Sequence, residues 1–306
     1  MTGFSARRAR QGLLLVAMAG AAGPAAAQGP DAAGVLVGGE FSYTVKSGDS
    51  LSSVGARFGV DPRLLAESNG LSPVAWLRVG QVLGVDNRHI VPFFLEQGIL
   101  INIPQRLLFL FQKSRLVAWY PVGLGRLDWP TEVGRFAIRT LERRPTWNVP
   151  SSIQEEMRRR GQIVPARVPP GPENPLGEYW IGFGTSGCGI HGTNAPASIY
   201  GFRTHGCIRL HPDDIADLVS RVSKEMAVEL VYQPVLLARA LDGAVFLEVN
   251  PDTYGWQEDT SRAVAALAER ESLETLLLPD VVEQVVARKE GLARRVDVRV
   301  APRAER

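Results

Sequence analysis

One segment, residues 191–210, constrains this chain more than any other: HGTNAPASIYGFRTHGCIRL. It contains one of only two cysteines, Cys207, directly after His205-Gly206 and sixteen residues beyond His191. Cysteine is strongly nucleophilic near neutral pH, but only as a thiolate, so it needs a neighbouring base to take its proton. Sixteen residues are enough for a strand, a loop and a return that bring His191 beside Cys207. The spacing therefore predicts a cysteine nucleophile with a histidine base.

The residues around Cys207 suit a turn that stabilises negative charge. Backbone N–H groups of residues 205–207 can point into one turn and form an oxyanion hole, and Gly206 lets the backbone approach a substrate closely. Arg209 follows on the same strand face as Cys207, where its planar fork can support the site or hold a carboxylate. His205 is expected to orient the loop or line the site rather than act as the base. The predicted site has Cys207 and His191 as catalytic residues, surrounded by His205, Gly206, Arg209, Gly192 and Thr204.

Two other interpretations of these cysteines and histidines are open. Cys188-x-x-His191 with His205-x-Cys207 would offer four soft ligands at spacings close to those of structural zinc. The glycines and Arg209 suit an anion-accepting loop better than a metal site. Covalent catalysis by a cysteine needs no metal and no organic cofactor, so we predict neither. Cys188 is expected to be a packing residue, with a disulfide to Cys207 as the alternative.

The segment resembles the active-site signature of the L,D-transpeptidases with a YkuD-type catalytic domain. Their pattern runs roughly HGTN, a Ser-Ile-Gly segment, then SHGCIRL, and residues 205–210 match it throughout. Tyr200 stands where the family usually has glycine, and Thr204 replaces the usual serine. The resemblance implies a mainly β, sandwich-like catalytic domain with the site in a cleft at one end. It also implies that Cys207 attacks a peptidoglycan stem peptide to form a thioester, which an amine of another stem or of an outer-membrane lipoprotein lysine then resolves.

A second resemblance covers residues 41–86, which look like a LysM domain, the small βααβ unit that binds glycan strands. Asp49 or Ser50 can cap a first helix, and Asp61-Pro62 starts a second one that ends at Asn69-Gly70. Gly84-Val85-Asp86 stands where the domain usually closes with Ile-Pro. The matching residues are Tyr43, Val45, Gly48, Asp49, Ser50, Leu51, Phe58, Gly59, Val60, Leu64, Asn69, Gly80, Gln81, Val82 and Leu83.

The N-terminus predicts export to the periplasm or cell envelope. Residues 1–27 have three arginines, an apolar run too short to span a bilayer, and Ala25-Ala26-Ala27, as in a cleaved signal peptide. The choice between the general and twin-arginine export routes stays open, and residues 28–40 are expected to be a linker. Removing three of the 34 basic residues and no acidic residue leaves 31 against 32, a net charge of −1. This balance gives no basis for nucleic acid binding.

The catalytic domain is predicted over residues 97–234, with a β pattern before the motif and a helix over 212–222 after it. The apolar stretches around Gln112-Lys113-Ser114 are expected to form a hairpin, and residues 227–232 to close the sheet. Thr131, Gly134 and Phe136 resemble the family's early sheet. An insertion between Pro145 and Tyr179, with a charged helix at 153–160 and a proline-rich stretch, resembles the envelope transpeptidases. It is predicted to be a lid over the site, with a solvated excursion as the alternative.

Residues 235–306 are expected to form an accessory, α-rich extension with helices near 260–271 and 279–289. No motif in this extension indicates a chemical function.

Two rival functions are compatible with the Cys207 and His191 motif. One keeps the thioester but uses water as acceptor, which makes a carboxypeptidase or a hydrolase that releases lipoprotein. The other is a non-catalytic wall-binding protein that acts through its LysM domain alone.

Overall fold

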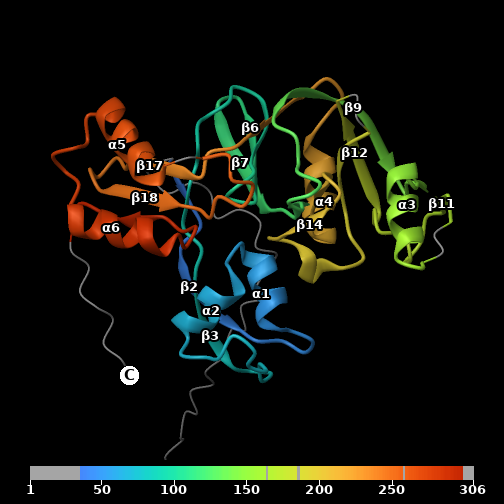
Figure 1. The fold of residues 1–306 in the computed structure, drawn as a ribbon, viewed down its shortest axis with the longest axis horizontal. Coiled ribbons are helices and arrows are strands. Elements are labelled where there is room, and N and C mark those ends of the chain that lie inside the picture. Colours follow the sequence, from blue (N-terminus) through green and yellow to red (C-terminus); the bar gives the residue numbers. More distant parts are fainter. Residues whose placement is uncertain (1–34, 163–164, 185–186, 258, 299–306) are drawn as a thin grey trace, which may run out of the picture.

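The computed structural model describes residues 35–298, except 163–164, 185–186 and 258 (Figure 1). The predicted signal peptide and most of the predicted linker lie outside the described residues. No helix in the described part of the chain is long and apolar enough to cross a membrane.

Residues 40–86 form the βααβ unit that the sequence predicts. The side chain of Ser50 accepts the backbone N–H of Ser53, and the Ser53 hydroxyl accepts the N–H of Ser50, so the first helix begins with a capping box. Asp61 caps the second helix, which has Pro62 in its first turn. The two strands pair with each other antiparallel. The elements are β2 (Glu40–Thr44), α1 (Leu51–Phe58), α2 (Pro62–Ser68) and β3 (Val82–Asp86).

The catalytic region is built on one eight-stranded mixed sheet. Its order is β15-β13-β12-β9-β16-β5-β6-β7. The pairs β16–β5 and β13–β15 are parallel, and the other pairs are antiparallel. The strands are β5 (Gly98–Asn102), β6 (Leu107–Gln112), β7 (Arg115–Pro121), β9 (Gly134–Arg143), β12 (Tyr179–Phe183), β13 (Gly189–His191), β15 (Ile208–Arg209) and β16 (Ala227–Val231).

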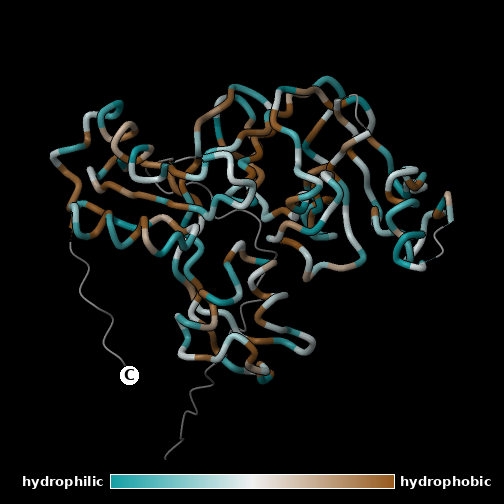
Figure 2. Tube along the Cα trace, in the orientation of Figure 1, coloured by the Kyte–Doolittle hydropathy of each residue, from teal (hydrophilic) through white to brown (hydrophobic). Residues whose placement is uncertain are grey.

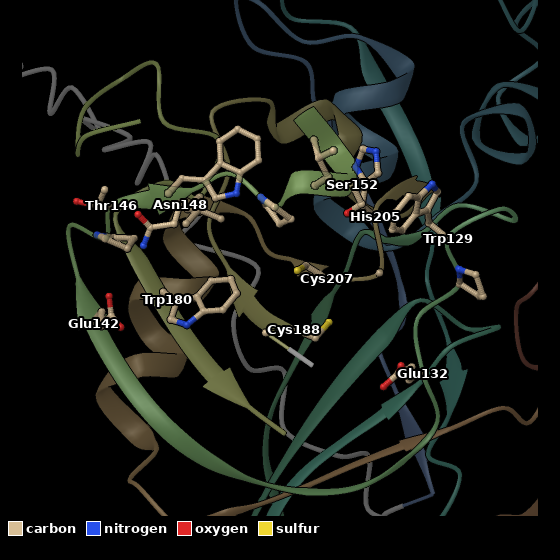
Figure 3. A pocket seen from close by; sticks show the side chains of 18 of the residues that line it. Trp129, Glu132, Glu142, Thr146, Asn148, Ser152, Trp180, Cys188, His205 and Cys207 are labelled. Carbon is tan, nitrogen blue, oxygen red and sulfur yellow. The ribbon is translucent and has the colours of Figure 1, made fainter. Parts of the chain in front are cut away.

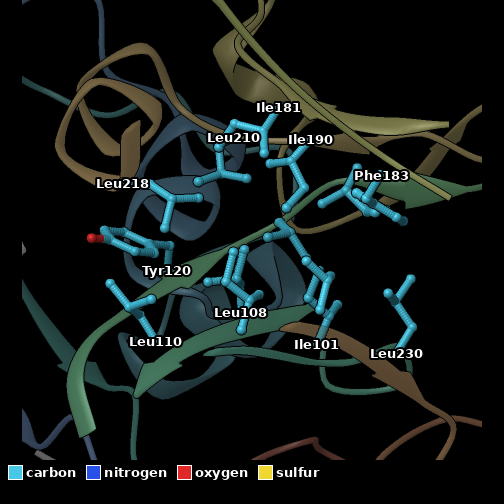
Figure 4. Packing of buried hydrophobic residues seen from close by; sticks show 14 of the residues in the cluster. Ile101, Leu108, Leu110, Tyr120, Ile181, Phe183, Ile190, Leu210, Leu218 and Leu230 are labelled. Carbon is cyan, nitrogen blue, oxygen red and sulfur yellow. The ribbon is translucent and has the colours of Figure 1, made fainter. Parts of the chain in front are cut away.

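The long strand β9 lets the sheet curl around a single core. Its residues 134–137 pair with β16, whereas residues 138–143 pair with β12. Apolar side chains from both halves of the sheet, such as Leu108 and Ile190, therefore pack in one cluster (Figure 4). This confirms the mainly β, sandwich-like architecture that the sequence predicts.

Two details of the sheet differ from the sequence prediction. The apolar stretch 99–111 forms two strands instead of one hairpin arm, because Pro104 lacks an N–H for a ladder and Arg106 turns the chain with φ 57°. Strand β16 lies inside the sheet, between β9 and β5, instead of closing an edge. The predicted turn is present: Lys113 and Ser114 have the positive φ values that a two-residue hairpin turn needs.

Shorter elements flank the sheet. The predicted helix after the motif buries Ile215 and Leu218 against the core. The insertion forms a two-stranded ribbon and a helix, far from the extension in Figure 1. These elements are α4 (Pro212–Arg221), β10 (Trp147–Asn148), α3 (Ser151–Arg159), β11 (Arg167–Val168), β8 (Leu124–Gly125), β14 (Phe202–Thr204), the 3-10 turn η1 (Pro196–Ser198), β1 (Leu36–Val37) and β4 (His89–Ile90).

The C-terminal extension has its own apolar core. Both helices that the sequence predicts are present, and a three-stranded antiparallel sheet packs against them. Figure 2 shows apolar stretches along its strands, with hydrophilic residues on the helices. The elements are β17 (Val235–Arg239), β18 (Val245–Val249), α5 (Thr260–Glu271), α6 (Pro279–Arg288) and β19 (Arg294–Arg295).

The three parts of the chain meet at a buried polar junction. His89 lies 3.1 Å (Nε2) from the carbonyl oxygen of Gly59 and 3.2 Å (Nδ1) from Oε1 of Glu248 in β18. Gln105 also donates to Glu248. Helix α1 contacts η1, which lies between His191 and Cys207 in the chain. The LysM unit is therefore packed against the catalytic domain.

Candidate active site

The strand pairing brings His191 and Cys207 to the same face of the sheet. Strands β13 and β15 run parallel, with Ile190 opposite Ile208, and both isoleucines are fully buried in the core. Side chains alternate between the two faces of a strand. His191 and Cys207, which each adjoin one of these isoleucines, therefore lie on the face away from the core.

His191 is a buried, neutral imidazole with a defined tautomer. Its Nδ1 lies 2.6 Å from the carbonyl oxygen of Gly192, which can only accept, so Nδ1 carries the proton and Nε2 keeps a free lone pair. Burial and the charge of Arg209 lower the pKa of His191 to about 4. The Trp180 ring stacks on the imidazole at 5.9 Å between centroids. These contacts leave Nε2 as a proton acceptor at neutral pH.

Cys207 interacts with the second cysteine of the chain. Both thiols are free, and both line the same pocket. Interaction with the Cys188 thiol, the backbone N–H of Gly189 and the charge of Arg209 lower the pKa of Cys207 to about 7, against the effect of burial. The same interaction and burial raise the pKa of Cys188. Cys188 therefore interacts with the Cys207 thiol, whereas the sequence predicted a packing residue.

The turn at Gly206 is held by two threonine hydroxyls. Gly206 has φ +100°, a conformation that favours glycine. The hydroxyl of Thr131 donates to the carbonyl oxygen of Gly206 at 2.9 Å, and that of Thr204 donates to the carbonyl oxygen of Cys207 at 2.6 Å. Thr204 thus keeps the hydroxyl of the serine that the family usually has. Within the described residues, the N–H groups of Gly206 and Cys207 have no protein acceptor.

His205 is fixed by an ion-pair network from the insertion. Its Nε2 lies 2.7 Å from Oε2 of Glu156 on α3, which also pairs with Arg126 and Arg160. The hydrogen bonds from Arg126 and His205 lower the pKa of Glu156 to about 2. The His205 ring meets Trp129 edge-on at 5.3 Å. His205 also lines the pocket, and its role in orienting the loop stays a prediction.

Arg209 and Gly192 contact site residues without being among the described residues that line the pocket, and Gly192 does so through its carbonyl oxygen, 2.6 Å from Nδ1 of His191. Arg209 donates to the hydroxyl of Ser198 at 2.9 Å, and burial lowers its pKa. Arg209 is not among the described residues that line the pocket, so it influences Cys207 by its charge.

Tyr200 has φ 58°, a conformation that favours the glycine that the family usually has at this position. The Arg106 guanidinium lies 3.9 Å from the centroid of the Tyr200 ring.

Cys207, Cys188 and His205 line a pocket of about 650 Å³ (Figure 3). The insertion, which the sequence predicts to be a lid, walls this pocket mostly through side chains between residues 145 and 153, and of the described residues of 158–177 Leu176 alone lines it. Acidic and aromatic side chains complete the lining. They are Asp128, Glu132, Glu142, Trp129, Trp147 and Trp180.

The zinc interpretation has no geometric support. Among the described residues, no three His, Cys, Asp or Glu side chains gather in a way that could hold a metal ion. One ring nitrogen of His191 bonds the carbonyl oxygen of Gly192, and one ring nitrogen of His205 bonds the carboxylate of Glu156.

Several residues of the site were missed from the sequence. Trp180, Glu156 and Arg126 gave no signal, because each reaches the site through a contact distant in the chain. Thr131 was noted only as part of an early strand pattern. Trp180 lies opposite His191 in β12, and its ring leaves no room for a Cβ at Gly189, but only the strand pairing shows this.

Comparisons with known proteins agree with this geometry. The family model for the L,D-transpeptidase catalytic domain (YkuD) matches residues 96–232, and that for the LysM domain matches residues 43–86. The chain is 34% identical over 222 residues to the probable L,D-transpeptidase ErfK/SrfK of Escherichia coli K12, covering 70% of each protein. It is 30% identical over 262 residues to the probable L,D-transpeptidase YbiS of the same strain, covering 82% of this chain and 83% of that one.

Solved structures of the same kind are more distant. An Enterococcus faecium L,D-transpeptidase variant has 17% identity and a TM-score of 0.35, over 51% of this chain and 57% of that one. Mycobacterium tuberculosis L,D-transpeptidase 3 has 15% identity and a TM-score of 0.36, over 64% and 93% of the two chains.

Proposed function

Because this chain belongs to the L,D-transpeptidase family of cysteine-dependent acyltransferases, we propose that Cys207 is its nucleophile and His191 its general base. The observation that carries this proposal is the fixed tautomer of His191. Its Nδ1–H is committed to the carbonyl oxygen of Gly192, so Nε2 is free to take a proton on the face that carries Cys207. A pKa of about 4 keeps that nitrogen unprotonated at neutral pH.

The first half-reaction forms a thioester. The Cys207 proton passes to Nε2 of His191 as the sulfur attacks the stem-peptide carbonyl that precedes the terminal D-residue. The carbonyl oxygen becomes an oxyanion, which the backbone N–H of Cys207 stabilises. The C–N bond then breaks, the D-residue leaves as an amine, and the His191 imidazolium returns the proton to it.

The second half-reaction transfers the acyl group. The acceptor ammonium first loses one proton to solvent, and the neutral amine then attacks the thioester carbonyl while it gives a second proton to Nε2 of His191. The C–S bond breaks, and the Cys207 sulfur takes the proton back from the imidazolium. The product is a new amide, and no metal or organic cofactor enters either step.

We propose an amine as acceptor because the pocket is acidic. Glu132 and Glu142 line it, and their negative field attracts an ammonium group, whereas Arg126 offsets the charge of Asp128. Water carries no charge and gains nothing from that field. A second stem peptide and a lipoprotein lysine both present such an amine, and both are acceptors under this proposal.

The two matched domains imply a protein that binds peptidoglycan. We propose that residues 41–86 hold the enzyme on glycan strands and that residues 97–234 carry the chemistry, which raises the local concentration of stem peptides. The proposed location is the periplasm or cell envelope, after export directed by residues 1–27.

We also propose that the start of the insertion shields the thioester from water. Trp147, Pro150 and Ile153 line the pocket beside Cys207, and apolar walls exclude water from a reacting centre.

The experiment that tests the whole proposal is mass spectrometry of the full mature chain after incubation with purified wall fragments.

We expect an adduct on Cys207 that lacks the terminal D-residue, followed by cross-linked stems or lipoprotein adducts. Cys188→Ala is the matched control, since it keeps the proposed nucleophile and removes the other thiol. Trimmed stems without any cross-link would establish water as the acceptor. An adduct on Cys188, or none in the presence of bound substrate, would refute the nucleophile assignment.

A further inference from the structure

A tyrosine of the C-terminal extension lies behind the turn that carries Cys207. The hydroxyl of Tyr254 donates to the carbonyl oxygen of Gly125 at 2.6 Å and accepts the backbone N–H of Thr131 at 3.1 Å. Only 7% of Tyr254 is exposed. The extension, for which no role is predicted from the sequence, thus reaches the strand and the loop that contact the turn of Cys207.

Thr131 passes this constraint on to the turn. Its hydroxyl donates to the carbonyl oxygen of Gly206 at 2.9 Å and accepts the N–H of Gly125 at 2.9 Å. A hydroxyl has a single proton to donate, so both the Thr131 and the Tyr254 hydroxyl have fixed orientations. The N–H of Gly125 donates to the Thr131 hydroxyl, and the carbonyl oxygen of Gly125 accepts from the Tyr254 hydroxyl. These bonds join the three residues in one network.

The network determines where the N–H of Cys207 points. The carbonyl of Gly206 and the N–H of Cys207 belong to one planar trans peptide group, so they point in opposite directions. The carbonyl points to Thr131, which is fully buried and is not among the described residues that line the pocket. The N–H of Cys207 consequently points away from Thr131, toward the side on which Cys207 lines the pocket.

We propose that Tyr254 is a positioning residue of the active site, acting through Thr131 to aim the Cys207 N–H at the oxyanion of the acylation step. The C-terminal extension is then a working part of the catalytic domain instead of a separate accessory unit. This inference rests on the proposed function, because it assumes that acyl transfer takes place at Cys207.

The ring of Tyr254 is held independently of its hydroxyl. It stacks on Tyr232 at 5.6 Å and contacts Trp256 at 4.9 Å and Phe202 at 5.4 Å between centroids. A phenylalanine keeps all three ring contacts. Tyr254→Phe therefore removes the hydroxyl from the network with little change in packing.

The test compares two reactions of the same sulfur in the mature full-length chain. Alkylation by iodoacetamide needs the thiolate of Cys207 but forms no oxyanion. Acylation by a stem tetrapeptide needs the thiolate and also needs an N–H group that stabilises the oxyanion. We expect Tyr254→Phe to slow acylation by about 10- to 100-fold, the scale of effect that a small misplacement of reacting groups produces. Alkylation should keep its rate and its pH profile.

Three further variants separate positioning from general stability. Thr131→Val should reproduce the selective loss, and Thr131→Ser should restore acylation because it keeps the hydroxyl. The double variant Tyr254→Phe/Thr131→Val should be acylated no more slowly than the slower of the two single variants, because both substitutions act through one network. Tyr232→Phe is the matched control: its hydroxyl bonds Asp252 and the N–H of Tyr254 but not Thr131, so the ratio of acylation to alkylation should not change.

Unchanged acylation in Tyr254→Phe, or an equal fall in both reactions, would overturn the inference. So would the same selective loss in Tyr232→Phe. A wild-type chain that is alkylated at Cys207 but never acylated there would refute the proposed function itself, which distinguishes the two failures.

Discussion

Oε2 of Glu156 lies 2.7 Å from Nε2 of His205, and this contact ties the inserted helix α3 to the turn that carries Cys207. Arg126 and Arg160 pair with the same carboxylate. The insertion, which the sequence predicts to be a lid, is therefore attached to the catalytic motif by ion pairs.

We predict that Glu156→Gln removes part of the acid sensitivity of the protein. The pKa of Glu156 is about 2 in the folded chain, below its ordinary value of 4.5. A depressed pKa means that the carboxylate stabilises the fold above pH 4.5 and that this contribution disappears as the pH falls toward 2. Melting temperatures measured between pH 2 and 6 should fall less steeply in Glu156→Gln than in wild type. Parallel curves would show that the ion pairs contribute no stability.

Cys207→Ala should abolish acyl transfer while leaving the melting temperature and wall binding close to wild type. The thiol is proposed as the nucleophile, and the backbone hydrogen bonds of the turn do not involve its sulfur. Product analysis by mass spectrometry measures the loss. Residual turnover in Cys207→Ala that persists in the double variant with Cys188→Ala would exclude a cysteine mechanism.

His191→Gln should slow acylation by roughly 10²- to 10⁴-fold, the usual contribution of a general base. Glutamine still donates a hydrogen bond but cannot accept the thiol proton. Single-turnover rates with a stem peptide measure the effect above pH 9 as well as at pH 7. The deficit should shrink at high pH, where Cys207 ionises without help, and a deficit that is constant with pH would favour a purely structural role.

Cys188→Ala should raise the pKa of Cys207 above its present value of about 7, because the Cys188 thiol is the main cause of the lowered pKa. Less thiolate is then present at neutral pH, so the rate of alkylation by iodoacetamide should reach its plateau at higher pH than in wild type. Cys188→Ser keeps a hydrogen-bond donor, so its alkylation rate should reach the plateau at a pH between those of wild type and Cys188→Ala. An unchanged profile would assign the lowered pKa to Gly189 and Arg209.

The sequence predicted those features that depend on local chemistry. Ser50 and Asp61 cap the LysM helices as expected, and Ile208 packs inward between Cys207 and Arg209, in agreement with the expectation that these two residues share a strand face. These elements follow from capping and from the alternation of side chains along strands, which are both readable over a few residues.

The supporting contacts were not predictable in the same way. Thr131 and Gly206 are 75 residues apart, His205 and Glu156 are 49 apart, and Thr131 and Tyr254 are 123 apart. Such pairs depend on how the sheet curls and where the extension packs, and no local pattern encodes them. The part of the insertion that walls the pocket was not predictable for the same reason, since a proline-rich composition does not say which part of an insertion faces the site.

Deleting residues 41–86 is expected to lower the melting temperature and to weaken reaction even with soluble stem peptides. A LysM domain attached only by a linker would leave that reaction intact. Here α1 contacts η1, close to the catalytic loop, and Gly59 bonds the buried His89. Soluble-peptide kinetics and thermal unfolding of the truncated chain measure both effects. Wild-type kinetics in the truncated chain would show that the contact has no influence on the site.

A point substitution separates wall binding from this structural role. Trp76 lies in the LysM unit and is 96% exposed beside Val74 and Val79, both also exposed, so its loss removes no packing. An exposed aromatic ring offers a flat apolar surface to a sugar ring, and truncating a central interface tryptophan commonly weakens binding by about tenfold or more. Trp76→Ala should therefore reduce cosedimentation with insoluble wall while soluble-peptide kinetics and melting temperature stay at wild-type values. Leu241→Ala, at an 80% exposed position in the extension, is the control and should bind normally. Equal cosedimentation of all three proteins would place the glycan contact elsewhere on the LysM surface.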